Sequence, residues 1–234
     1  MITTILFDLD GTLLPMDQDK FVKSYIGRMA KKLAPYGYDP ERLTAGLWKG
    51  TGAMVKNTGE HTNEEVFWSV FNNIHGKDCR VDENLFMEYY RNEFQEVAQD
   101  CGFDSRAAET IETIKGLGYK VVLATNPLFP SIATYSRAKW AGLNPDDFEI
   151  ITTYENSRHC KPNLDYYRDI LDTLHLKAEN CVMVGNDVQE DMVAEMLGIR
   201  VFLLTDYLIN RTGEDISRYS HGSFPELLTF IRGL

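Results

Sequence analysis

The hydrophobic pattern of the chain begins with an apolar run at residues 2–7 that ends at the segment Asp8-Leu9-Asp10-Gly11. Apolar residues without helical spacing predict a buried strand, and a strand that is apolar along its whole length is typical of a parallel sheet covered on both faces. Ligands of open α/β sheets bind at the carboxyl ends of the strands. In extended backbone the side chains of Asp8 and Asp10 point the same way, so a divalent cation or a shared proton would relieve their repulsion.

Residues 17–100 contain no second run of this kind and show apolar residues at helical spacing instead. The spacing predicts helices at about residues 21–33, 41–48, 63–74 and 82–98. Thr62 and Glu65 have the spacing of a capping box, which marks the start of the third helix. The segments Gly50-Thr51-Gly52 and Asn57-Thr58-Gly59 predict loops between helices.

The remainder of the chain alternates strands and helices. The pattern predicts strands at residues 119–124, 148–152, 181–184 and 200–204, and helices at 105–117, 131–141, 163–174, 190–197 and 224–231. This order predicts an α/β fold, a Rossmann-like parallel sheet core with right-handed crossovers and an inserted all-helical domain. We expect the core to comprise residues 1–15 and 101–234, and the insert residues 16–100.

The composition narrows the possible partners. The chain has 234 residues, of which 44% are hydrophobic and 25% charged, as in ordinary globular proteins that bury a sizeable core. Its formal net charge of −11 argues against a nucleic-acid partner, since that binding depends on Lys and Arg, and it disfavours anionic membrane surfaces. A phosphate-bearing substrate needs only local positive charge, so the negative net charge of the chain does not exclude one.

The cysteines and the hydropathy pattern indicate a compartment. Cys79, Cys101, Cys160 and Cys181 form no CxxC pair and no zinc-ligand spacing, so we expect reduced thiols. No apolar run approaches the roughly 20 residues of a membrane span, and the first residues lack the basic region of a signal peptide. We therefore expect a cytoplasmic protein.

The segment Asp8-x-Asp10-Gly11-Thr12-Leu13, placed after an N-terminal apolar strand, resembles the first motif of the haloacid dehalogenase superfamily, whose members are mostly phosphatases. The resemblance implies that Asp8 attacks phosphorus and that Asp10 is the general acid and base.

Two further segments resemble the second and third motifs of that superfamily. Thr125 follows an apolar strand, and the resemblance implies that its hydroxyl holds a phosphate oxygen, with Asn126 or a loop N–H as a second donor. Lys161 precedes a predicted helix, where a cation opposes the helix dipole and is not placed for helix stability. By the resemblance, Lys161 neutralises charge on phosphoryl oxygens; Arg158 and His159 are nearby alternatives for a basic role.

The segment Gly185-Asn186-Asp187 resembles the fourth motif, which supplies carboxylate for magnesium. The resemblance implies that Mg²⁺ is held by the carboxylates of Asp8 and Asp187 and by the backbone carbonyl of Asp10. Many relatives carry an acidic residue at the position of Asn186. Asp191 either orients Lys161 or a metal-bound water, or is an acidic residue favoured in the first turn of a helix.

The placement and helical character of residues 16–100 resemble the C1-type cap of the superfamily. The resemblance predicts a Mg²⁺-dependent phosphatase that hydrolyses a small phosphorylated metabolite through an aspartyl-phosphate. Candidate specificity residues lie in the predicted cap loops, at residues 48–52 (Trp48, Lys49, Gly50, Thr51 and Gly52) and at Lys56 and Asn57.

Other functions are compatible with the same motifs. A phosphotransferase of the β-phosphoglucomutase type has the same core and the same two aspartates, and a catalytically silent binding module could use the same fold. Dehalogenation is disfavoured, because Asp10 and the magnesium aspartate serve phosphate chemistry. The oligomeric state stays open.

Overall fold

The computed structural model describes all residues, 1–234, and contains one parallel sheet of five strands in the order β2-β1-β3-β4-β5. The strands are β1 (Thr4–Phe7), β2 (Lys120–Leu123), β3 (Cys181–Gly185), β4 (Arg200–Leu204) and β5 (Ser220–Gly222). Strand β1 lies inside the sheet, where it pairs with β2 on one side and with β3 on the other. The predicted α/β class is therefore confirmed.

The sheet is buried on both faces, as the apolar run of β1 predicts. Ile5 and Phe7 belong to one hydrophobic cluster and Leu6 to another, because successive side chains of a strand point to opposite faces. The helices connecting or flanking these strands are α5 (Ser105–Gly116), α6 (Ser131–Trp140), α7 (Leu164–Thr173) and α8 (Phe224–Arg232).

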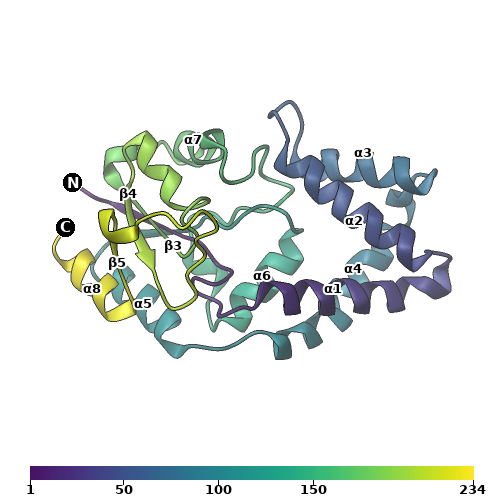
Figure 1. Cartoon of the computed structure of the whole chain (residues 1–234), viewed down its shortest axis with the longest axis horizontal. Helices are drawn as coiled ribbons and strands as arrows, with labels where there is room; N and C mark the ends of the chain where they lie inside the picture. The colour runs from purple at the N-terminus through teal and green to yellow at the C-terminus, as the bar shows by residue number, and fades with distance from the viewer.

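The segment between β1 and α5 contains helices and no strand, and its helices lie to one side of the sheet, at the right of Figure 1. Its α-helices are α1 (Gln18–Leu33), α2 (Pro40–Val55), α3 (Asn63–His75) and α4 (Glu83–Arg91), and the 3₁₀ helix η3 (Glu93–Asp100) ends it. Its two connections to the sheet run side by side, since Met16 pairs with Cys101 and Gly102 N–H donates to the Pro15 carbonyl oxygen. The exact division into core and cap stays a prediction.

The predicted start of α3 is confirmed by its hydrogen bonds. Thr62 Oγ1 accepts from the Glu65 N–H, and the Glu65 carboxylate accepts from the Thr62 N–H. No helix of the chain combines the length and the apolar character that a membrane crossing requires.

The loop predicted at Gly50-Thr51-Gly52 is wrong, because these residues lie inside α2. Gly50 lets α2 approach α3 closely: a Cβ at this position would lie 2.6 Å from Cδ2 of Phe67. A packing contact between two helices thus explains a glycine that the local sequence presents as a loop signal.

Three other predicted elements differ from the structure. The helix at 82–98 breaks at Asn92, whose side-chain amide donates to the Glu88 carbonyl oxygen and competes with the helical backbone. The segment 148–152 lies beside β2 as predicted, since the N–H groups of Glu149 and Thr152 donate to β2 and its Leu123 N–H donates to the Ile150 carbonyl oxygen, but its pairing is limited to one bridge at Ile151 and it forms no regular strand.

The helix predicted at 190–197 is a 3₁₀ helix, η6 (Met192–Leu197), because the Asp187 side chain accepts from the N–H groups of Gln189 and Glu190 and holds the preceding residues in a turn. The short strand β5 was not predicted, since its three residues have no apolar pattern.

Two of the three glycines of α2, Gly50 and Gly52, give a matched test of this packing. No atom lies within 4 Å of a Cβ built on Gly52, so Gly52→Ala should raise the free energy of unfolding by about 0.5–1 kcal/mol. Gly50→Ala should lower it, since overpacking against Phe67 costs about 1–3 kcal/mol. Urea denaturation of both variants checks this, and equal stabilisation by the two substitutions would contradict the close helix contact.

Candidate active site

The candidate site lies at the carboxyl ends of the three adjacent strands β2, β1 and β3. Asp8 follows β1 directly, Thr125 follows β2 and Asp187 follows β3. The structure brings the predicted residues around one cavity of about 190 Å³, which is lined by Asp8, Asp10, Thr125, Asn126, Asp187 and Asp191. Lys161 reaches the same place from the loop before α7.

Lys161 is buried between two carboxylates. Its Nζ lies 2.9 Å from Asp8 Oδ1 and 2.7 Å from Asp191 Oδ1, and the residue is only 1% exposed. Burial acts to lower the pKa of Lys161, but the carboxylates of Asp191 and Asp8 outweigh it and hold that pKa well above its usual value. The site therefore holds a fixed cation beside Asp8.

Two glycines permit this close packing. Gly185 ends β3, and a Cβ there would lie 2.1 Å from Asp191 Oδ2, which accepts a hydrogen bond from the Asp187 N–H (3.0 Å). Gly11 has a φ of +87°, and a Cβ there would lie 2.3 Å from Asn186 Nδ2. Any other side chain at either position would displace a polar group of the site.

Asn186 links the first motif to the fourth. The Thr12 hydroxyl lies 3.1 Å from Asp8 Oδ2 and 3.0 Å from Asn186 Oδ1, and Asn186 Nδ2 donates to the Tyr207 carbonyl oxygen at 2.6 Å. The Asn186 amide thus supplies both an acceptor and a donor at this position.

Arg137 of α6 is a site residue that the sequence reasoning missed. Its Nη1 donates to Asp10 Oδ2, and the residue is 1% exposed. Burial raises the pKa of Asp10, while the Arg137 guanidinium acts in the opposite direction. Its position in the helix is the signal that could have found it. Arg137 lies on the same buried face of α6 as Ala133 and Ala138, where a charge without a partner is costly.

Arg211 and Glu190 were also missed. Arg211 Nη1 donates to Asp187 Oδ2 from the loop after β4. The Asn126 side chain donates to Glu190 Oε2 (3.0 Å) and accepts from the Lys161 N–H (3.2 Å), so it braces two loops. Arg211 comes from a segment with no motif of its own, whereas Glu190 lies between Asp187 and Asp191 of the fourth motif.

The alternative basic residues lie outside the cavity. Arg158 donates to the carbonyl oxygens of Gly59 and Glu60, and His159 Nδ1 lies 2.7 Å from the Asp169 carboxylate. Lys161 is therefore the predicted cation that contacts Asp8.

The candidate specificity residues lie in three different environments. Trp48 and Thr51 line a second cavity between the helices, whereas Lys49 and Lys56 are exposed. Asn57 donates to the His61 carbonyl oxygen and to Asn63 Oδ1, so it supports the loop before α3.

Comparisons with known proteins agree with this geometry. The family described as haloacid dehalogenase-like hydrolase matches residues 2–207. The phosphoglycolate phosphatase of Colwellia psychrerythraea is 26% identical over 97% of this chain and 96% of that protein. The glyceraldehyde 3-phosphate phosphatase of Methanocaldococcus jannaschii is 27% identical over 100% of this chain and 99% of that protein.

Solved structures share the fold. A 2-haloacid dehalogenase from Pseudomonas syringae pv. Tomato has a TM-score of 0.65 at 17% identity, covering 100% of this chain and 99% of that one. The magnesium-bound hydrolase YfnB from Bacillus subtilis has a TM-score of 0.57 at 18% identity, covering 98% of both chains. The four motifs, the parallel sheet and the match over residues 2–207 together show that this chain belongs to the haloacid dehalogenase-like hydrolases.

Proposed function

We propose that the protein is a Mg²⁺-dependent phosphatase that hydrolyses a small phosphate monoester through a phosphorylated Asp8. The observation that carries the proposal is the buried Lys161, which contacts the carboxylate of Asp8 at the edge of a cavity that Asp10 and Thr125 also line. The phosphatase names of two relatives that align along their whole length support the same reaction.

The residues of the cavity fit a magnesium ion. Its carboxylates are Asp8, Asp10, Asp187, Glu190 and Asp191, whereas its cationic lining residues are only Arg137 and Arg211. No three His, Cys, Asp or Glu side chains form a ready-made ligand group. The carboxylates of Asp8 and Asp187 and the Asp10 carbonyl would therefore hold the ion together with water, a ligand set that Mg²⁺ prefers. Bound magnesium would neutralise charge between Asp8 and the phosphoryl oxygens.

Asp8 and Asp10 take different roles in the proposed reaction. An oxygen of Asp8 attacks phosphorus in line, and the bond from phosphorus to the ester oxygen breaks. Protonated Asp10 gives its proton to the leaving alkoxide and then accepts a proton from the water that attacks the aspartyl-phosphate. The buried environment that raises the pKa of Asp10 favours its protonated form and suits this first step.

Lys161 and Thr125 would stabilise the transferring phosphoryl group. Lys161 is fixed by Asp191 before any substrate binds, so its charge needs little reorganisation during the reaction. The helical segment before α5 would act as the cap, because residues Phe21 and Val22 of α1 already line the catalytic cavity.

Replacing the nucleophile tests the reaction directly. Asp8→Asn keeps the shape of the side chain but removes the attacking carboxylate, so phosphate release from acetyl phosphate should fall by about 10³-fold or more. Asp146→Asn makes the same chemical change at an exposed position and should keep full activity. Equal activity of the Asp8 variant and the parent, or release of halide from a 2-haloacid in place of phosphate, would contradict the proposal.

Removing divalent cations tests the metal. Treatment with a chelator should abolish phosphate release, and added Mg²⁺ should restore it, because the acidic cavity would otherwise repel the phosphate. Steady-state rates measured before chelation, after it and after adding Mg²⁺ check this. Full activity in excess chelator would rule out the proposed cofactor.

Removing the buried cation should affect both stability and activity. Lys161→Met leaves Asp8 and Asp191 buried without their partner, at a cost of about 3–5 kcal/mol in the free energy of unfolding. Adding Asp191→Asn to that variant should recover part of the stability but none of the phosphatase activity. Urea denaturation and rate measurements on both variants separate the two effects; recovery of activity would contradict a catalytic role for Lys161.

A further inference from the structure

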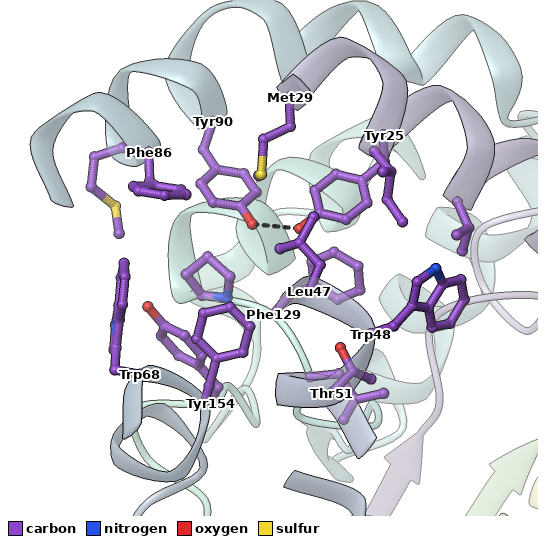
Figure 2. Close-up of a pocket in the computed structure, with 16 residues that line it drawn as sticks. Tyr25, Met29, Leu47, Trp48, Thr51, Trp68, Phe86, Tyr90, Phe129 and Tyr154 are labelled. Atoms are coloured by element: carbon purple, nitrogen blue, oxygen red, sulfur yellow. Dashed lines mark hydrogen bonds between the residues drawn. The ribbon is translucent and has the colours of Figure 1, made fainter. Parts of the chain in front are cut away.

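A second cavity of about 170 Å³ lies among the helices beside the catalytic one. Sixteen residues line it, of which 14 are hydrophobic and none is charged. Helices α1 to α4 contribute most of the wall, and the segment after β2 closes it (Figure 2).

The two cavities meet at three shared side chains. Val22, Leu128 and Phe129 line both of them. The Phe129 ring lies 4.3 Å from the guanidinium carbon of Arg137, which pairs with Asp10, and 5.3 Å from the ring of Tyr25, which lines the second cavity. A group attached to a phosphate at Asp8 would therefore reach the second cavity past Phe129.

The second cavity is uncharged at neutral pH. The hydroxyl groups of Tyr25 and Tyr90 lie 3.1 Å apart and bond to each other (Figure 2), and burial raises the pKa of Tyr25 to about 12. The two arginines of the neighbouring catalytic cavity are already paired, Arg137 with Asp10 and Arg211 with Asp187. A carboxylate on the leaving group would find no cationic side chain in the second cavity.

Two tryptophans complete the apolar wall. Trp48 lies at the rim and is 56% exposed, which is a large apolar surface for a soluble protein to leave uncovered. Trp68 is 3% exposed, and its Nε1 has no hydrogen-bond partner within the protein. The cavity thus offers an aromatic surface with an unpaired indole N–H, and it offers no ionic contact.

We propose that the second cavity binds the alcohol part of the substrate, so that the preferred substrates are phosphate monoesters of apolar alcohols about the size of a phenyl group. This inference rests on the proposed phosphatase function and narrows its substrate class. The volume is sufficient, because an apolar cavity of about 150 Å³ is known to hold benzene. Burial of the apolar group would supply the binding energy that an ionic contact supplies for polar metabolites.

The experiment compares primary alcohol esters, so that the leaving groups differ mainly in size and polarity. The substrates are ethyl, pentyl and 2-phenylethyl phosphate and, as the charged counterpart, phosphoglycolate. We expect kcat/KM to rise about fourfold per added methylene from ethyl to pentyl phosphate. We expect 2-phenylethyl phosphate to exceed ethyl phosphate by about 10- to 100-fold and phosphoglycolate to fall below both.

A variant that fills the second cavity tests the same inference, and a second variant of the same helix serves as its control. Thr51→Phe places a ring in the second cavity and should reduce the 2-phenylethyl to ethyl preference by at least about tenfold. Ala45→Phe adds the same ring at an exposed position of the same helix and should leave the preference unchanged. The substrate series on the parent protein needs neither variant, so a Thr51 variant that fails to fold leaves the proposal testable.

The outcomes separate this inference from the proposed function. Hydrolysis of acetyl phosphate, whose leaving group is the small acetate ion, reports the catalytic cavity without an apolar alcohol group. If acetyl phosphate is hydrolysed but kcat/KM does not rise with apolar size, or if phosphoglycolate is preferred, the inference is overturned and the phosphatase function stands. If neither acetyl phosphate nor any ester is hydrolysed, the proposed function itself fails, and the inference fails with it.

Discussion

The ammonium group of Lys161 lies between the carboxylates of Asp8 and Asp191, and this buried contact sets the arrangement of the loops around it. Removing three charged groups from water costs several kcal/mol per ion, so each must have a partner in the folded protein. The contact joins the end of β1, the start of α7 and the loop after β3. This contact also requires a glycine at position 185, because the Asp191 carboxylate occupies the space that a side chain there would fill.

The charged and the apolar side chains around the site come from different parts of the chain. The sheet supplies the charged groups at its carboxyl edge, whereas the inserted helices supply a wall that is almost entirely hydrophobic. Phe129 lies at the boundary, with the Arg137 guanidinium over its ring and Tyr25 against it. The charged groups at the sheet edge and the apolar wall of the inserted helices can therefore vary independently in related chains, since different segments encode them.

Much of the sheet and of the site could be predicted from sequence, because the signals are local. The apolar run before Asp8 predicts both the strand and its burial on both faces, and Thr125, Lys161 and Asp187 each follow or precede a regular element. The predictions failed where distant contacts decide the structure. Gly50, which the local sequence presents as a loop signal, lies inside α2, and the ring of Phe67 on α3 occupies the space that a side chain at this position would need.

Arg137 was missed for the same reason. A single arginine in a helix is ordinary, and only the fold shows that it pairs with Asp10, which lies 127 positions earlier in the chain. The apolar cavity could not be predicted either. Aromatic residues at helical spacing predict a buried face, but they do not show whether the faces of four helices pack together completely or leave a space.

The contact between Lys161 and Asp8 also has a consequence for biosynthesis, because the two residues are 153 positions apart. Asp8 leaves the ribosome first, and Lys161, Asp191 and strand β3 follow much later. The contacts of helices α1 to α4 and η3 with one another lie within residues 18–100, so they can form before Lys161 is made. The buried ion cluster is therefore completed late in synthesis, and a truncated product that ends before Lys161 contains Asp8 without the ammonium group that it contacts.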